Sequence, residues 1–294
     1  MKWEALTIAI VGGDEREQEI SRLAAETGAE VRAFGFPSPD GGIQKVHQAT
    51  GAAAALRGAR YALFPIPGLS LDGSLYAPSA PAPIVPDEQL LGELAEDAHI
   101  ILGTADNRLR EAADRTSVEL HEYESDNELM LLRAPAIVEG ALQVAIEHTR
   151  VTIHATEVAV VGHGTIGSLL ARSLIALNAR VHVFARNPVQ RAAAHASGAN
   201  AHPLDELPAF APSLRIIFST VPAPVLQKPV VEQLPPDALL IDLAAPPGGV
   251  DLEAARKLGR SAVWARGLGR RAPITVGASQ WYGIRRRIEA IEEA

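Results

Sequence analysis

The stretch VAVVGHGTIGSLLARSLIALNARVHVFARN, residues Val158–Asn187, constrains the fold more than any other part of this chain. Its first four residues form an apolar run that is typical of a buried strand, and a glycine-rich turn follows directly. The next segment, Thr165–Leu177, carries Ile and Leu at helical spacing on one face, as expected for a helix that covers a sheet. Strand, glycine turn and helix in this order predict a βαβ unit in a doubly wound α/β domain.

The turn matches the GxGxxG pattern of dinucleotide-binding sites. Its residues are Gly162, His163, Gly164, Thr165, Ile166 and Gly167. The first glycine permits the tight turn, the second lets the backbone approach a pyrophosphate, and the third lets helix and strand pack closely. The free N–H groups at the helix start favour the pyrophosphate. We therefore predict that these six residues form a dinucleotide-binding turn. The alternative is a tight turn that binds nothing. Within the turn, His163 is expected to fill a position that the pattern leaves unconstrained.

Arg186 bears on the identity of that dinucleotide. NAD sites place an acidic side chain at the end of the second strand, about 20 residues beyond the turn. Here Ala185, Arg186 and Asn187 follow that strand, and the nearest acid is Asp205. Arg186 can pair with a 2′-phosphate, with Arg191 one helical turn further on as a second candidate. The sequence favours NADP over NAD, although an Arg186 that only stacks on the adenine would accept both.

Two more loops follow predicted strands of the same domain, and the carboxyl ends of such strands border the ligand in α/β sheets. We expect cofactor contacts from Thr220, Val221, Pro222, Asp242, Leu243 and Ala244. The alternative for both loops is that their prolines and glycines only shape turns and that neither loop contacts a cofactor.

The N-terminal half also shows an alternation of predicted strands and helices. It starts with an apolar run over Thr7–Val11, a Gly12-Gly13 turn and a helical pattern over Glu15–Thr27. The fold class is therefore α/β with two domains. We predict a Rossmann- or flavodoxin-like parallel sheet domain over residues 1–136, a bridging helix over 137–152, an NAD(P)-binding Rossmann domain over 153–274, and a C-terminal helix over 275–294 that packs back on the first domain.

Composition excludes several classes of protein. The chain has 294 residues, is 47% hydrophobic and carries a formal net charge of -8, which suits a globular protein and disfavours nucleic-acid binding. It contains no cysteine, so disulfides, thiolate zinc sites and a Cys nucleophile are excluded. No group of residues has metal-ligand spacing, and no metal is expected. The apolar run near the N-terminus is too brief for a membrane segment, and a cytoplasmic protein is expected.

Five stretches together match one known family: Ile8–Asp14, Val138–His148, the glycine turn, Leu240–Asp251 and Gly267–Gly277. Through them the chain resembles the A subunit of bacterial dipicolinate synthase over nearly its whole length. The resemblance implies an NADP-dependent enzyme that oxidises dihydrodipicolinate to dipicolinate (pyridine-2,6-dicarboxylate) in sporulation. It also implies the flavoprotein-like B subunit of dipicolinate synthase as partner. A small dicarboxylate substrate and a homo-oligomer are expected.

Some positions depart from the family pattern, in which Arg stands at Thr165, Asn at Ser219 and Ser at Ala245. These departures keep two alternatives open: another NADP-linked dehydrogenase of a small carboxylate, and a non-catalytic NADP-binding protein that regulates or scaffolds a partner. All nine histidines lie at or before His202, which disfavours a 2-hydroxyacid dehydrogenase with a late catalytic histidine.

Forming an aromatic pyridine drives the implied reaction, so the site has to orient a hydride and accept one proton. Glu139, at the start of the bridging helix, is the first candidate for the proton acceptor or for substrate orientation. The alternative is that its carboxylate only stabilises the start of the helix, where the helix dipole favours a negative charge. Asp14 is the second candidate, with helix capping as its alternative role. Residues expected to meet the substrate are Gly13, Arg16, Asp72 and Gly73, although Arg16 could instead lie on a solvated helix face.

Overall fold

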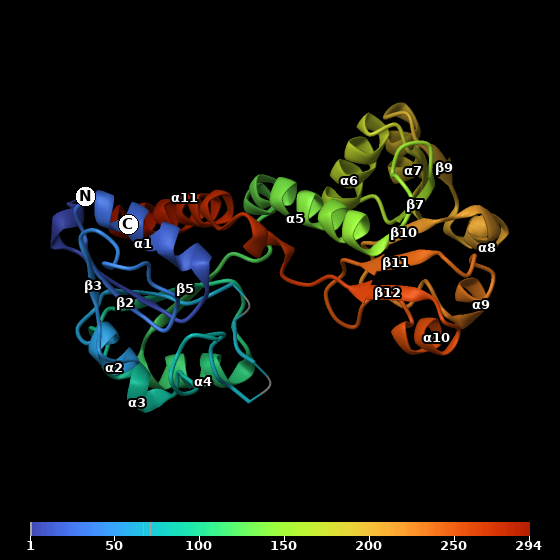
Figure 1. The fold of residues 1–294 in the computed structure, drawn as a ribbon. Coiled ribbons are helices and arrows are strands. Elements are labelled where there is room, and N and C mark those ends of the chain that lie inside the picture. The colour runs from blue at the N-terminus through green and yellow to red at the C-terminus, as the bar shows by residue number, and fades with distance from the viewer. Residues whose placement is uncertain (1, 67, 71) are drawn as a thin grey trace. The chain divides into compact units, whose positions relative to one another are not determined.

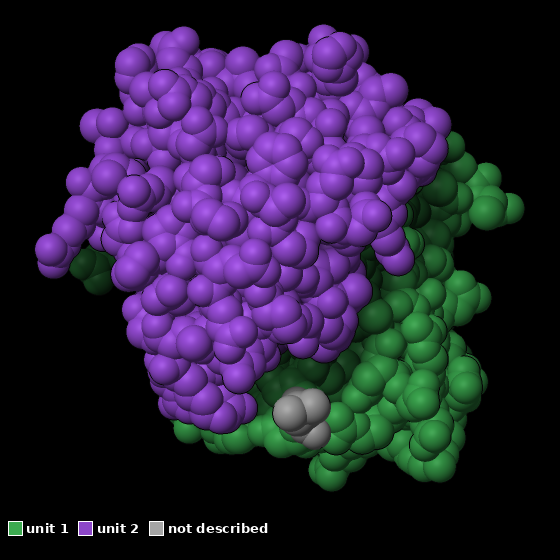
Figure 2. All heavy atoms as spheres, turned by 90° about the vertical axis from the view of Figure 1, so that its right-hand side faces the viewer, with its two compact units in different colours: residues 1–133, 272–294 green, residues 134–271 purple. Residues whose placement is uncertain are grey.

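The computed structural model describes residues 2–66, 68–70 and 72–294 (Figure 1). The chain divides into two compact units, coloured separately in Figure 2. Unit 1 contains residues 1–133 and 272–294, and unit 2 contains residues 134–271. Each unit is built on its own six-stranded parallel sheet, so the predicted two-domain α/β class is confirmed.

The sheet of unit 1 has the strand order β3-β2-β1-β4-β5-β6. Its strands are β1 (Thr7–Val11), β2 (Glu30–Phe34), β3 (Val46–Gln48), β4 (Tyr61–Leu63), β5 (His99–Leu102) and β6 (Glu119–Glu122). Its helices are α1 (Glu15–Glu26), α2 (Ala52–Leu56), α3 (Glu88–Leu91), α4 (Asn107–Thr116) and α11 (Pro273–Glu292). Since β1 and β4 are neighbours while the chain leaves β1 toward β2, the sheet changes winding direction between them.

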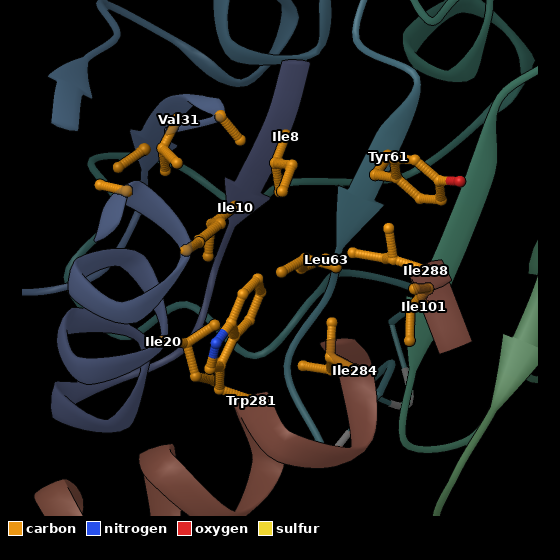
Figure 3. Packing of buried hydrophobic residues seen from close by; sticks show 14 of the residues in the cluster. Ile8, Ile10, Ile20, Val31, Tyr61, Leu63, Ile101, Trp281, Ile284 and Ile288 are labelled. Atoms are coloured by element: carbon orange, nitrogen blue, oxygen red, sulfur yellow. The ribbon is translucent and has the colours of Figure 1, made fainter. Parts of the chain in front are cut away.

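Helix α11 is the C-terminal helix that was predicted to return to the first domain, and it does so. Its side chains Trp281, Ile284 and Ile288 are buried in one cluster with the apolar face of β1, as Figure 3 shows. Helix α11 approaches α1 so closely at Gly277 that a side chain would not fit, because a Cβ there would lie 2.6 Å from the carbonyl oxygen of Arg16. Helices α1 and α11 therefore pack side by side over this face of the sheet.

The sheet of unit 2 has the order β12-β11-β10-β7-β8-β9. Its strands are β7 (Glu157–Val161), β8 (Arg180–Phe184), β9 (Asn200–His202), β10 (Ile216–Ser219), β11 (Leu239–Asp242) and β12 (Ser261–Trp264). Its helices are α6 (Thr165–Ala176), α7 (Pro188–Ala196), α8 (Leu207–Phe210), α9 (Lys228–Val231) and α10 (Leu252–Lys257). Numbered within each unit, both sheets read 3-2-1-4-5-6, the order of Rossmann folds rather than of flavodoxin.

Helix α5 (Asn127–His148) contains the boundary between the units, which falls after Arg133. It begins ten residues before position 137, where the bridging helix was expected, because Asp126 caps it by accepting from the N–H groups of Glu128 and Leu129. By length and composition α5 is apolar enough to cross a membrane. Its residues Val138, Ala141 and Ala145 are buried in the hydrophobic core of unit 2.

Candidate functional site

The glycine turn of unit 2 joins β7 to α6, and its three glycines have three different surroundings. Gly162 has a φ of +95°, and a Cβ there would collide with the hydroxyl of Thr220. A Cβ on Gly167 would collide with the carbonyl oxygen of Gly162. A Cβ on Gly164 would meet nothing within 4 Å. Two glycines therefore close the turn by packing, and the third presents backbone to open space, which is the arrangement a pyrophosphate requires.

The start of α6 is suited to an anion. Gly164 is its N-cap and so supplies no side-chain hydrogen bond, and the first turn holds no acidic residue. The first N–H groups of a helix carry a partial positive charge and need a partner. Because no side chain caps α6, these groups remain available to a phosphate.

The corresponding turn of unit 1 differs in this respect. Asp14 is the N-cap of α1 and accepts from the N–H of Arg16, while the Glu17 carboxylate accepts from the N–H of Asp14 at 2.7 Å. The N–H of Gly13 donates to the carbonyl oxygen of Tyr76 at 2.6 Å. Carboxylates and a carbonyl therefore satisfy the turn of unit 1 internally, and of the two turns that of unit 2 is the one open to an anion.

The loop after β8 holds the residues expected to read the ribose. Asn187 caps α7 by accepting from the N–H of Val189 at 2.8 Å. Arg191 donates to the carbonyl oxygens of Ala185 and Arg186, at 2.9 and 2.7 Å, and so fixes the loop. The Arg186 side chain is exposed and makes no hydrogen bond or ion pair with another residue that the structure describes. Arg186 is therefore the available cation of this loop, and Arg191 stabilises its shape.

Asp242, at the end of β11, shapes the loop that follows it. Its buried carboxylate accepts from the N–H groups of Ala244, Gly249 and Val250, at 3.0, 2.7 and 3.0 Å. The indole N–H of Trp264 donates to the carbonyl oxygen of Ala244. The Asp242 carboxylate therefore points toward the loop that follows β11. Its role in the site is to hold this loop in place.

At the end of β10, Thr220 donates its hydroxyl to the carbonyl oxygen of Val161 at 3.0 Å, which ties this loop to the glycine turn. Val221 lies against Gly162, where it leaves no space for a Cβ. The neighbouring Ser219 hydroxyl is buried and has no partner among the described residues. The loops after β7 and β10 therefore meet where the strand order changes direction.

His163 corrects an expectation from the sequence, in which it filled an unconstrained position. Its side chain is buried, and its Nδ1 has no hydrogen-bond partner in the part of the chain that the structure describes. Burial lowers the pKa of His163, which keeps the ring neutral at pH 7. The glycine spacing could not reveal this burial, because the pattern leaves the second position free.

Glu139 lies on α5 within unit 2, with its carboxylate exposed and paired with Arg271. The adjacent Gly140 packs against Leu268, which follows the carboxyl end of β12. After α5 the chain enters β7 from its amino end, so the part of α5 around Glu139 lies toward the carboxyl edge of the sheet. Glu139 is therefore on the same edge as the glycine turn.

Asp14 and Arg16 form a buried pair in unit 1. Both oxygens of Asp14 accept from the Arg16 guanidinium, at 2.7 and 2.9 Å. Arg16 is only 7% exposed, so its alternative placement on a solvated helix face is wrong. Beside the pair, burial raises the pKa of Glu17 to about 7, although Arg16 opposes the shift. Glu17 was not among the predicted site residues, and its capping-box position is the signal that could have identified it.

Asp72 and Gly73 lie on the loop between β4 and α3, of which Pro67 and Leu71 are outside the described residues. The Asp72 carboxylate accepts from the N–H and the hydroxyl of Ser74, at 3.0 and 2.7 Å, and these bonds lower its pKa. Gly73 has a φ of +86°, which favours glycine at this turn. A hollow of about 340 Å³ is lined by residues of this loop, among them Ser70, Ser74 and Tyr76.

Fold and site together define the class of this protein: a two-domain α/β chain with a dinucleotide-type glycine turn, as in NAD(P)-dependent oxidoreductases. The family model for the N-terminal domain of the dipicolinate synthase A subunit matches residues 7–124, and that of "Shikimate / quinate 5-dehydrogenase" matches residues 144–257. The dipicolinate synthase A subunit of Bacillus subtilis (strain 168) is 30% identical over 273 residues, which is 92% of each chain. The chain belongs to the family of dipicolinate synthase A subunits.

Solved structures agree with this assignment. The chain matches the dipicolinate synthase A subunit from Bacillus halodurans with a TM-score of 0.89 and 27% identity, over 97% of this chain and 98% of that one. It matches the Bacillus subtilis protein with a TM-score of 0.86 and 28% identity, over 98% and 97%. A transhydrogenase from Sinorhizobium meliloti shares the fold, with a TM-score of 0.74 at 14% identity over 97% and 94%.

Proposed function

We propose that this protein is an NADP-dependent dipicolinate synthase A subunit, which oxidises dihydrodipicolinate to dipicolinate. Family membership supports the substrate. The observation that carries the proposal is the turn at Gly164, where backbone and an uncapped helix start face open space. The substrate loses a hydride and a proton, and the product is the aromatic pyridine dicarboxylate.

The residues of unit 2 suit a nicotinamide dinucleotide. Its chemical contribution when bound is to accept the hydride. The turn of Gly162, His163, Gly164, Thr165, Ile166 and Gly167 would hold the pyrophosphate through backbone N–H groups. The loops with Thr220, Val221, Pro222, Leu243 and Ala244 would border the nicotinamide, with Asp242 as the residue that positions the last loop.

Arg186 supports NADP as the cofactor. Its guanidinium is exposed, without a partner among the described residues, at the end of the second strand. A 2′-phosphate there would form a charge-assisted pair with it, whereas NAD offers only hydroxyl groups at this point. Ala185, Asn187 and Arg191 hold the loop in the shape that presents Arg186.

Glu139 is our first candidate for the proton acceptor, because its carboxylate is exposed on the edge of the sheet that carries the glycine turn. Asp14 is the second candidate, but both of its oxygens already accept from Arg16. For the substrate carboxylates we propose Gly13, Arg16, Asp72 and Gly73. Of these, Asp72 would act through the loop that it holds by binding Ser74.

The family also suggests a setting for this activity. We propose a cytoplasmic enzyme of sporulation that works with a flavoprotein-like B subunit and forms a homo-oligomer. If the B subunit supplies the catalytic step instead, this chain would be an NADP-binding regulatory protein. Assays with and without the B subunit distinguish these two outcomes.

The experiment compares two N-cap glycines. Gly164 and Gly51 each cap a helix, each has a φ below zero, and a Cβ on either meets nothing within 4 Å. Gly164→Val should weaken NADPH binding at least about tenfold, because its side chain fills the space beside the turn. Gly51→Val, in unit 1, should leave affinity unchanged. Equal affinities in both variants would refute the role of this turn.

A further inference from the structure

A cluster of two histidines and one glutamate lies in unit 1, outside the site described above. His99 is the first residue of β5, and Glu119 and His121 are on β6, the strand that pairs with it. In the parallel register His99 is opposite Glu119, and His121 is two residues further along the same face. The two strands therefore bring three potential metal ligands together, although their spacing in the sequence gives no such signal.

The separations of the ligand atoms match a small metal ion. His99 Nδ1 lies 3.1 Å from His121 Nε2 and 3.4 Å from Glu119 Oε2. His121 Nε2 and Glu119 Oε2 are 3.8 Å apart. A circle through three points with these separations has a radius of about 2.0 Å, which is the zinc–nitrogen and zinc–oxygen bond length. One ion can therefore reach all three atoms without movement of the backbone.

Two positively charged residues lie near the cluster. The nearby arginines are themselves paired, Arg60 with Glu292 and Arg287 with Asp126. Their positive charge is thus partly balanced before a cation arrives.

We propose that His99, Glu119 and His121 bind one divalent transition-metal ion, with Zn²⁺ as the best match to two imidazoles and a carboxylate. Imidazole ligands favour Zn²⁺, Co²⁺, Ni²⁺ or Cu²⁺ over Mg²⁺ and Ca²⁺. The Glu119 side chain is 70% exposed, which leaves a path for the ion to enter. Three protein ligands leave a fourth position for a water molecule, and small rotations of the ligand side chains would bring the four ligands to a tetrahedron.

The position of the cluster indicates a structural role. His99 and Glu119 are the first residues of their strands, so the ion would lie at the amino edge of the sheet, whereas ligands of α/β sheets bind at the carboxyl edge. β6 stands at the end of the strand order and pairs with β5. A metal ion would thus tie the edge strand to its neighbour.

The test uses the untagged full-length chain, stripped of metal with a chelator and dialysed. Zn²⁺ titration by calorimetry should give one site per chain, and Co²⁺ should give the visible absorption of a tetrahedral complex. Glu119→Gln and His121→Gln, at exposed and half-buried positions, should each weaken Zn²⁺ binding at least about tenfold. Saturating Zn²⁺ should raise the melting temperature of the unmodified chain by about 5 °C, and that of His121→Gln much less.

A matched control lies in unit 2, where His182 Nδ1 and His202 Nε2 are 3.0 Å apart. There the second ring nitrogen of His182 contacts Glu157, so the carboxylate does not converge on the atoms of the pair. His202→Gln should leave Zn²⁺ affinity unchanged. The proposal is overturned if the unmodified chain binds no tighter than His121→Gln, or if His202→Gln loses as much affinity.

Discussion

Asp14 and Gly164 occupy the same position in the two units: each is the N-cap of the helix that follows the first strand of its sheet. Asp14 supplies a carboxylate to the start of α1, and Gly164 supplies none to the start of α6. Two sheets of the same strand order therefore differ at this point in their ability to accept a phosphate. On this difference rests our proposal that the dinucleotide binds to unit 2.

Gly164→Asp should convert the open turn into a closed one. The new carboxylate would cap α6 and stabilise it by roughly a few tenths of a kcal/mol, while repelling a pyrophosphate at the same place. We expect NADPH affinity to fall about a hundredfold with no loss of melting temperature. Gly51→Asp, which caps α2 in the same way, controls for the added charge and should keep full affinity. Undiminished binding to Gly164→Asp would contradict the assignment.

Arg186→Glu should change cofactor preference. Removing the cation and adding a negative charge should weaken NADPH by about tenfold to a hundredfold, as expected for loss of a charge-assisted pair, and should weaken NADH much less. Arg172→Glu, at an exposed arginine on α6, carries the same charge change away from the loop. Fluorescence titration of both cofactors checks this, and equal losses for NADPH and NADH would rule out the 2′-phosphate role.

Glu139→Gln should lower kcat by about a hundredfold, the contribution typical of one general base, and should leave NADPH affinity unchanged. Its ion pair with Arg271 is exposed, so the free energy of unfolding should change by less than about 1 kcal/mol. Glu147→Gln, an exposed carboxylate on the same helix, is the control. If kcat is unaffected in Glu139→Gln, the proton goes elsewhere and Asp14→Asn becomes the next variant to assay.

Glu17 should make the stability of unit 1 depend on pH. Its pKa is raised from 4.5 to about 7 in the folded protein, so the folded state binds more protons than the unfolded state between these values. Stability from this group is therefore fully present below pH 4.5 and is lost as pH rises to about 7. The loss is about 3 kcal/mol. Chemical denaturation of Glu17→Gln should lack this component, and a pH profile identical to that of the unmodified chain would contradict it.

What depends on local spacing could be predicted from the sequence. Gly162, Gly164 and Gly167 act within one strand–turn–helix segment, and their pattern alone indicated the turn. The helical pattern of the C-terminal segment likewise predicted α11. The starts of helices were harder to predict. The bridging helix was expected to begin at residue 137, whereas α5 begins at Asn127 because the Asp126 side chain caps it there.

Contacts between distant residues could not be predicted in the same way. His163 is buried by the fold around the turn, and the Asp242 carboxylate accepts from a loop that returns to it. His99 meets Glu119 only through the register of β5 and β6. These features depend on which strands pair and how loops fold back, and no local pattern carries that information.

The most direct test of the proposed function follows hydride transfer in the purified chain. Dihydrodipicolinate and NADP⁺ are supplied with and without the B subunit, and the absorbances of dipicolinate and NADPH are recorded together. We predict that both products form in equal amounts and that, at subsaturating NADP⁺, Gly164→Asp slows the formation of both by about a hundredfold. Formation of neither product under any of these conditions, by protein that binds NADPH normally, would contradict the proposed activity.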